Sequence, residues 1–109
     1  MDNLLEVTDN SFDAQVLKCD IPVLTFFSAD WSAPAKKMRP ILSELAPTYQ
    51  DRLKIVELDI ETNPVVTSDY AVLNVPTLVL VKRGMEVERM SGVISKEKLL
   101  EKVIPFLDE

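Results

Sequence analysis

Residues Ala29-Asp30-Trp31-Ser32-Ala33-Pro34-Ala35 join a continuous apolar run, 23–27, to a helical pattern, 36–46. The apolar run predicts a strand that is covered on both faces of a sheet. Ser32 is a good N-cap and Pro34 suits the first helical turn, so a helix is expected to begin here. A strand that leads directly into a helix places unpaired N–H groups and the positive end of the helix dipole at the edge of the sheet. We therefore look for the functional site at this junction.

Further elements are predicted on both sides of the junction. Before it, we expect a strand over 4–8 and a helix to Lys18, capped by Asp9, Asn10 or Ser11. After it, we expect a strand over 54–60, a helix from Asn63-Pro64 to Tyr70, a hairpin of strands 77–82 and 86–90 around Arg83-Gly84, and a last helix capped by Ser95. The order β-α-β-α-β-α-β-β-α predicts an α/β fold with a central mixed sheet and helices on both faces. Strands linked through helices should be parallel, and the terminal hairpin should be antiparallel.

Composition limits the classes of function. A chain of 109 residues with 47% hydrophobic content predicts one domain, residues 1–109. A net charge of −6 without basic clusters argues against a nucleic-acid or anionic-membrane surface. No apolar run approaches the roughly 20 residues that span a bilayer, and Met1-Asp2-Asn3 is not the basic start of a signal peptide. We therefore expect a cytoplasmic protein, a monomer, whose partners are proteins.

The cysteine and histidine counts exclude several kinds of site. The single cysteine, Cys19, cannot form an internal disulfide, and we interpret it as a half-buried apolar residue, with a regulatory or dimerising thiol as the alternative. The chain has no histidine, which excludes Ser-His and Cys-His catalytic arrangements. We expect neither a metal nor another cofactor.

The segment 31–35 resembles the motif of the thioredoxin family, Trp-Cys-Gly-Pro-Cys or its Trp-Cys-Ala-Pro-Cys variant, with Ser32 and Ala35 at the two cysteine positions. Further matches at the family's spacing are Lys36, Pro40, the segment 59–64, Val75-Pro76-Thr77, Gly84 and Gly92. The resemblance covers nearly the whole chain and implies the thioredoxin fold.

The resemblance assigns catalytic positions to Ser32 and Ala35. In the family, the first cysteine attacks a substrate disulfide as a thiolate, and the second resolves the mixed disulfide. A serine hydroxyl stays protonated without a base, and Ala35 has no nucleophile, so we expect redox inactivity. The simplest interpretation of Ser32 is a helix cap. A Ser-Lys hydrolase with Lys36 as the base is a remote alternative, because it needs a buried, neutral lysine.

The resemblance also implies a surface that binds client proteins, made by Trp31, Ala33, Pro34, Val75, Pro76 and Gly92. For Trp31 the alternative is simple packing in the core. The resemblance implies a cis bond between Val75 and Pro76, which would leave the backbone of Val75 free to pair with an extended client segment.

Two departures from the family concern the chemistry near the motif. Phe26 stands where most thioredoxins carry a buried aspartate that accepts the proton of the second cysteine. Glu57, where lysine is usual, is a candidate for that role in a cysteine-containing parent; the alternative is an ordinary exposed carboxylate. Ser28 replaces a common tryptophan, which should open the surface beside Trp31.

The leading hypothesis is a thioredoxin-type protein disulfide oxidoreductase whose two catalytic cysteines are substituted. A parent would be reduced by thioredoxin reductase and would reduce disulfides in protein clients. The alternative is a redox-inactive, thioredoxin-like module that binds proteins as a chaperone, scaffold or subunit. A weaker third hypothesis is anion binding at the helix terminus beside Ser32.

Overall fold

The computed structural model describes residues 4–107, so the opening Met1-Asp2-Asn3 lies outside it. Its elements in chain order are β1 (Leu5–Glu6), η1 (Asp13–Leu17), β2 (Val23–Ser28), α1 (Ala33–Thr48), β3 (Lys54–Asp59), α2 (Pro64–Asp69), β4 (Thr77–Lys82), β5 (Met85–Ser91), α3 (Lys96–Val103) and η2 (Ile104–Phe106). The strands form one sheet in the order β1-β3-β2-β4-β5. The predicted mixed sheet is confirmed.

The direction of β4 differs from the prediction. β2 pairs in parallel with β3, as expected, but antiparallel with β4, although β3 and β4 are linked through a helix. The reason is the length of α2. Its six residues span about 9 Å, whereas the six residues of β3 span about 20 Å. The chain therefore does not return across the sheet, and β4 starts at the edge where β3 ends.

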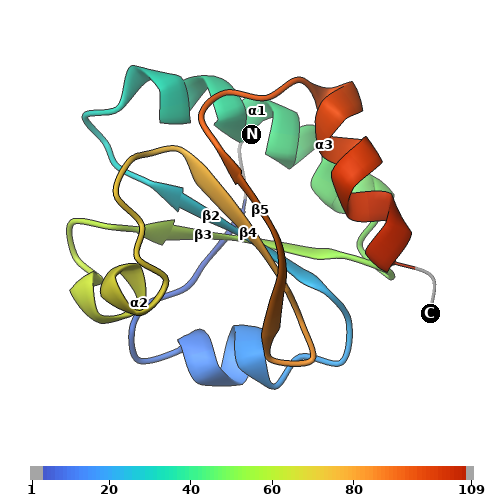
Figure 1. The fold of residues 1–109 in the computed structure, drawn as a ribbon, viewed down its shortest axis with the longest axis horizontal. Helices are drawn as coiled ribbons and strands as arrows, with labels where there is room; N and C mark the ends of the chain where they lie inside the picture. Colours follow the sequence, from blue (N-terminus) through green and yellow to red (C-terminus); the bar gives the residue numbers. More distant parts are fainter. Residues whose placement is uncertain (1–3, 108–109) are drawn as a thin grey trace.

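The sheet separates two layers of core (Figure 1). α1 and α3 cover one face, where Phe26, Met38 and Leu42 are fully buried. η1 and α2 cover the other face, where Phe27 and Val56 are fully buried. Both faces of β2 are buried along its whole length, which is why its sequence is apolar without alternation. No helix within residues 4–107 is long and apolar enough to cross a membrane.

The first two helices begin differently from the prediction. η1 is wound as a π-helix, in which the N–H of Lys18 donates to the carbonyl of Asp13 at 3.0 Å. Its N-cap residue is Phe12 and no side chain caps it, so the predicted cap by Asp9, Asn10 or Ser11 is wrong. The Asp9 carboxylate instead accepts from the N–H groups of Val65 and Val66, at 3.1 and 2.9 Å, and so caps α2. Asn63 precedes α2 as expected, but its side chain makes no cap; its Oδ1 accepts from the Asp9 N–H at 2.8 Å.

Candidate functional site

Four loops meet at one end of the sheet, which we call the motif end: 29–32 after β2, 60–63 after β3, 70–76 before β4 and 92–95 after β5. Phe27 lies opposite Thr77 across β2 and β4, and Thr77 lies opposite Ser91 across β4 and β5. The Ile60 N–H donates to the Ser28 carbonyl at 2.9 Å, which fixes the loop after β3 beside the loop after β2. In Figure 1 the ends of β2 and β3 lie together at the left with the start of β4.

Ser32 and Ala35 are both buried at the start of α1. Ser32 has extended backbone angles and is only 4% exposed, and its Oγ accepts from the Ala35 N–H at 3.1 Å. The cap interpretation of Ser32 is therefore confirmed, and α1 begins at Ala33, earlier than the predicted helical pattern. Lys36 is exposed, so the buried lysine that the Ser-Lys alternative needs is not found next to Ser32.

Trp31 is 66% exposed, so the alternative interpretation, simple packing in the core, is wrong. Its indole Nε1–H donates to the Glu61 carboxylate at 3.1 Å, which ties the ring to the loop after β3. Ala33 and Pro34, which follow on the first turn of α1, are also exposed. An indole that is held at its polar edge presents its apolar faces to solvent in a defined orientation.

The Val75–Pro76 peptide bond is cis. Val75 precedes β4, so its N–H and C=O lie outside the ladder between β2 and β4. The Pro76 carbonyl accepts from the Gly92 N–H at 2.8 Å, and Gly92 has a φ of +82°, where a side chain would strain the backbone. These contacts place Val75, Pro76 and Gly92 together at the motif end.

Glu57 is not an ordinary exposed carboxylate. Its side chain is only 15% exposed and forms an ion pair with Arg39, which is 23% exposed. The Arg39 Nε–H donates to both Glu57 oxygens at 3.1 and 3.2 Å, and the Ser28 hydroxyl donates to Oε2 at 2.7 Å. The guanidinium also lies 6.0 Å from the centre of the Phe26 ring. An ion pair thus lies beside Phe26, under α1, where the family usually has a buried aspartate.

Sequence reasoning missed two features of the candidate site. Arg39 follows Ala35 by four residues and therefore shares its helix face, a spacing that could have indicated a charge near the second cysteine position. The second feature is apolar surface. Four of the seven large apolar side chains that are exposed among residues 4–107 belong to the motif end or to the first turn of α2, which starts there: Trp31, Val65, Leu73 and Val93.

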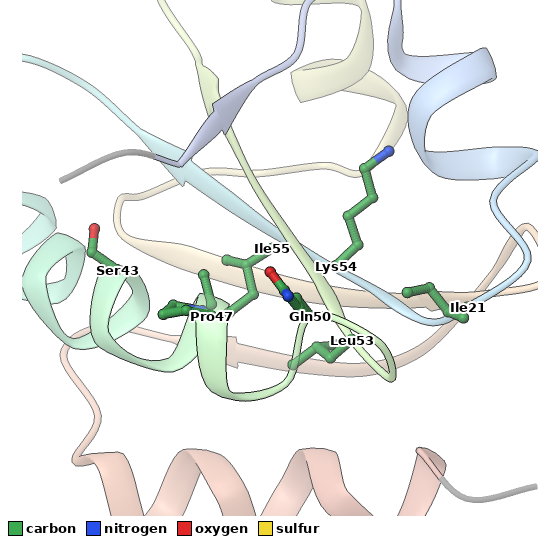
Figure 2. Close-up of a pocket in the computed structure, with 8 residues that line it drawn as sticks. Ile21, Ser43, Pro47, Gln50, Leu53, Lys54 and Ile55 are labelled. Carbon is green, nitrogen blue, oxygen red and sulfur yellow. The ribbon is translucent and has the colours of Figure 1, made fainter. Parts of the chain in front are cut away.

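A hollow of about 480 Å³ lies away from these loops, between the C-terminal half of α1 and the start of β3 (Figure 2). Ile21, Pro47, Leu53 and Ile55 give it apolar walls. The Lys54 amine is directed away from it and donates to the carbonyl and side-chain oxygens of Gln15, at 2.9 and 2.7 Å. None of the residues predicted as functional lines this hollow.

Comparison with known proteins gives matches over nearly the whole chain. The family described as Thioredoxin matches residues 3–104. The chain is 42% identical to a thioredoxin of Acidithiobacillus ferridurans over 98 residues, which cover 90% of this chain and 91% of that protein. It is 36% identical to a thioredoxin of Rickettsia bellii over 95 residues, 87% of this chain and 90% of that protein. It is also 40% identical to a bifunctional thioredoxin reductase/thioredoxin of Mycobacterium leprae over 96 residues, which cover 88% of this chain and 21% of that protein. The chain belongs to the thioredoxin family of protein disulfide oxidoreductases.

Proposed function

We propose that this chain is a thioredoxin-type disulfide oxidoreductase from which the two reactive sulfur atoms are missing while the client-binding surface is kept. The observation that carries the proposal is the state of the motif positions. Ser32 and Ala35 occupy them with ordinary helix-start geometry, and neither supplies a thiolate. Disulfide exchange by an attacking and a resolving thiol needs both, so the chain is redox-inactive as it stands.

The surroundings of these two positions support the proposal. Trp31, Ala33 and Pro34 are exposed, and the cis Pro76 is joined to Gly92 beside them. Restoring sulfur at 32 and 35 would therefore complete a dithiol next to a surface for protein clients. Its reductant would be a thioredoxin reductase, the activity that the name of the Mycobacterium leprae relative joins to a thioredoxin.

The test is turnover of a disulfide-bonded reporter protein with dithiothreitol as the reductant. The chain itself should be silent, and the Ser32→Cys/Ala35→Cys variant should turn over. The single Ser32→Cys variant is the matched control: mixed with the reporter in the absence of dithiothreitol, it should form a mixed disulfide that persists, because position 35 supplies no thiol to resolve it. All variants carry Cys19→Ser, which removes the native thiol. A folded double variant that stays silent contradicts the proposal.

Glu57 has a defined role in this proposal. Glu57 lies opposite Phe26 across β2 and β3, and Arg39 holds its carboxylate there. We expect Glu57→Gln in the restored dithiol variant to change the pH profile of turnover, because the proton of the second thiol loses its acceptor. An unchanged profile would exclude Glu57 from proton transfer.

The second candidate function is a protein-binding module without redox chemistry. Phe26 favours it, because a fully buried phenylalanine replaces the family's usual proton acceptor. This candidate is the better explanation if the restored variant is folded but does not turn over the reporter, while the chain still binds protein segments at Trp31.

A further inference from the structure

Leu73 is 93% exposed, the most exposed of the large apolar side chains in the described part of the chain. It belongs to the loop between α2 and β4. Large apolar side chains gathered on one surface commonly mark a site of protein interaction. No residue pattern in the sequence pointed to Leu73, and the role of the motif positions does not require it.

The loop that carries Leu73 is anchored on both sides. Before it, the Tyr70 carbonyl accepts from the Arg89 guanidinium at 2.6 Å. After it, the Asn74 carbonyl accepts from the Thr77 hydroxyl at 2.7 Å. Val72 and Val75 pack against the core layer on the side of the sheet that η1 and α2 cover. The backbone is therefore fixed in a form that directs Leu73 to solvent, so binding a partner there would order little additional chain.

The part of this surface next to Trp31 is acidic. The loops 29–32, 60–63, 70–76 and 92–95, together with Asp59 at the end of β3, contain the carboxylates Asp30, Asp59 and Glu61 and no lysine or arginine. Glu61 lies directly at the Trp31 indole. The cations at the border of this surface are Lys36 and Lys37 on the exposed side of α1, Lys96 directly after Ser95, and Arg89, which contacts the Tyr70 carbonyl and is paired with Glu86. An apolar surface with an acidic edge complements an apolar segment that carries basic residues.

We propose that Leu73, in the loop that leads to the cis Pro76, and Trp31, in the loop after β2, form two apolar anchor points, and that they select extended client segments with large apolar side chains flanked by lysine or arginine. The inference rests on the proposed client-binding role of the same end of the sheet. The basic flank would lie beside Asp30 and Glu61, and the apolar side chains would contact Trp31 and Leu73.

The experiment measures fluorescence anisotropy of labelled, end-blocked peptides that alternate large apolar and small residues. Matched peptides carry lysines, serines or glutamates at their ends, and one lysine peptide has alanine at every large position. The lysine peptide with large apolar residues should bind most tightly. Leu73→Ser should weaken it about tenfold, the scale of one lost leucine contact. Met85→Ser is the control, since Met85 is 67% exposed in the hairpin at the other end of β4.

The charge is tested separately. Asp30→Asn/Glu61→Gln removes two charges and keeps an oxygen that can accept from the Trp31 indole. It should weaken the lysine peptide about three- to tenfold at low salt and have little effect at about 0.5 M salt, where exposed charges are screened. The control, Glu97→Gln on α3, should change nothing. If the peptides bind without regard to their end charges or to Leu73, the inference is wrong.

The outcomes separate this inference from the proposed function. Turnover by the restored dithiol variant together with no peptide binding leaves the proposed function standing and overturns the inference. Peptide binding that depends on Leu73 and on charge, with a silent restored variant, supports the inference within the binding-module alternative.

Discussion

The ion pair between Arg39 and Glu57 should contribute far more to stability than an exposed pair does. Three charge-assisted hydrogen bonds join the two groups, and Glu57 also accepts from Ser28. Hydrogen bonds to charged groups contribute about 1.5–3 kcal/mol each when shielded from water. Because the two side chains are still 23% and 15% exposed, we expect a coupling energy of about 1.5–3 kcal/mol for the whole pair rather than a sum over bonds.

The assay is a double-mutant cycle with Arg39→Met and Glu57→Gln, in urea denaturation followed by far-ultraviolet circular dichroism. Trp31 fluorescence is a poor probe, because the ring is already 66% exposed in the folded chain. The control cycle uses Asp13 and Lys18, whose side chains are 62% and 74% exposed; it should give a coupling energy below about 0.5 kcal/mol. Equal coupling in the two cycles would refute the claim that burial under α1 strengthens the Arg39–Glu57 pair.

Three further predictions concern parts of the fold away from the motif positions. Thr25 is fully buried and its hydroxyl has no hydrogen-bond partner among the described residues, so Thr25→Val should raise the free energy of unfolding by about 1 kcal/mol; a loss of stability in urea denaturation would contradict this. Asp9→Ala should cost about 1–2 kcal/mol by uncapping α2, whereas the adjacent Asn10→Ala should cost little. Burial, followed by the charges of Glu86 and Asp69, raises the pKa of Tyr70 above its usual value. As the pH rises, the unfolded chain loses the Tyr70 proton before the folded chain does, so the free energy of unfolding should fall above about pH 10. The melting temperature of the Tyr70→Phe variant should fall less over the same pH range.

Much of the fold could be predicted because local patterns and tertiary packing agree. β2 is apolar at every position and is buried on both faces. Ser32 and Ser95 each lie at a predicted helix start. The hydroxyl of each serine accepts a hydrogen bond from the backbone N–H of the residue three positions later. Arg83 and Gly84 both adopt positive φ, as the tight turn between β4 and β5 requires. In these cases a few neighbouring residues decide the local structure.

Features that depend on distant residues could not be read from local patterns. The cap of α2 comes from Asp9, more than fifty positions earlier in the chain. The direction of β4 depends on the short length of α2. The helix was predicted from the sequence, but the antiparallel direction of the strand that follows it was not. The pairing of Arg39 with Glu57 joins α1 to β3 across the core layer. Each feature arises only when two elements meet in space.

The motif end keeps its order without sulfur, because each residue there has a structural contact of its own. Ser32 satisfies a backbone N–H of α1 through its hydroxyl, which a thiol does more weakly. Trp31 is tied to Glu61, and Pro76 to Gly92, by hydrogen bonds that involve neither motif position. Under the proposed function, client binding and disulfide chemistry are therefore separable: the surface depends on the loops and their anchors, and the chemistry depends on two side chains. A chain with Ser32 and Ala35 at the motif positions thus keeps the apolar surface with its acidic edge at Trp31, whatever side chains the chemistry requires.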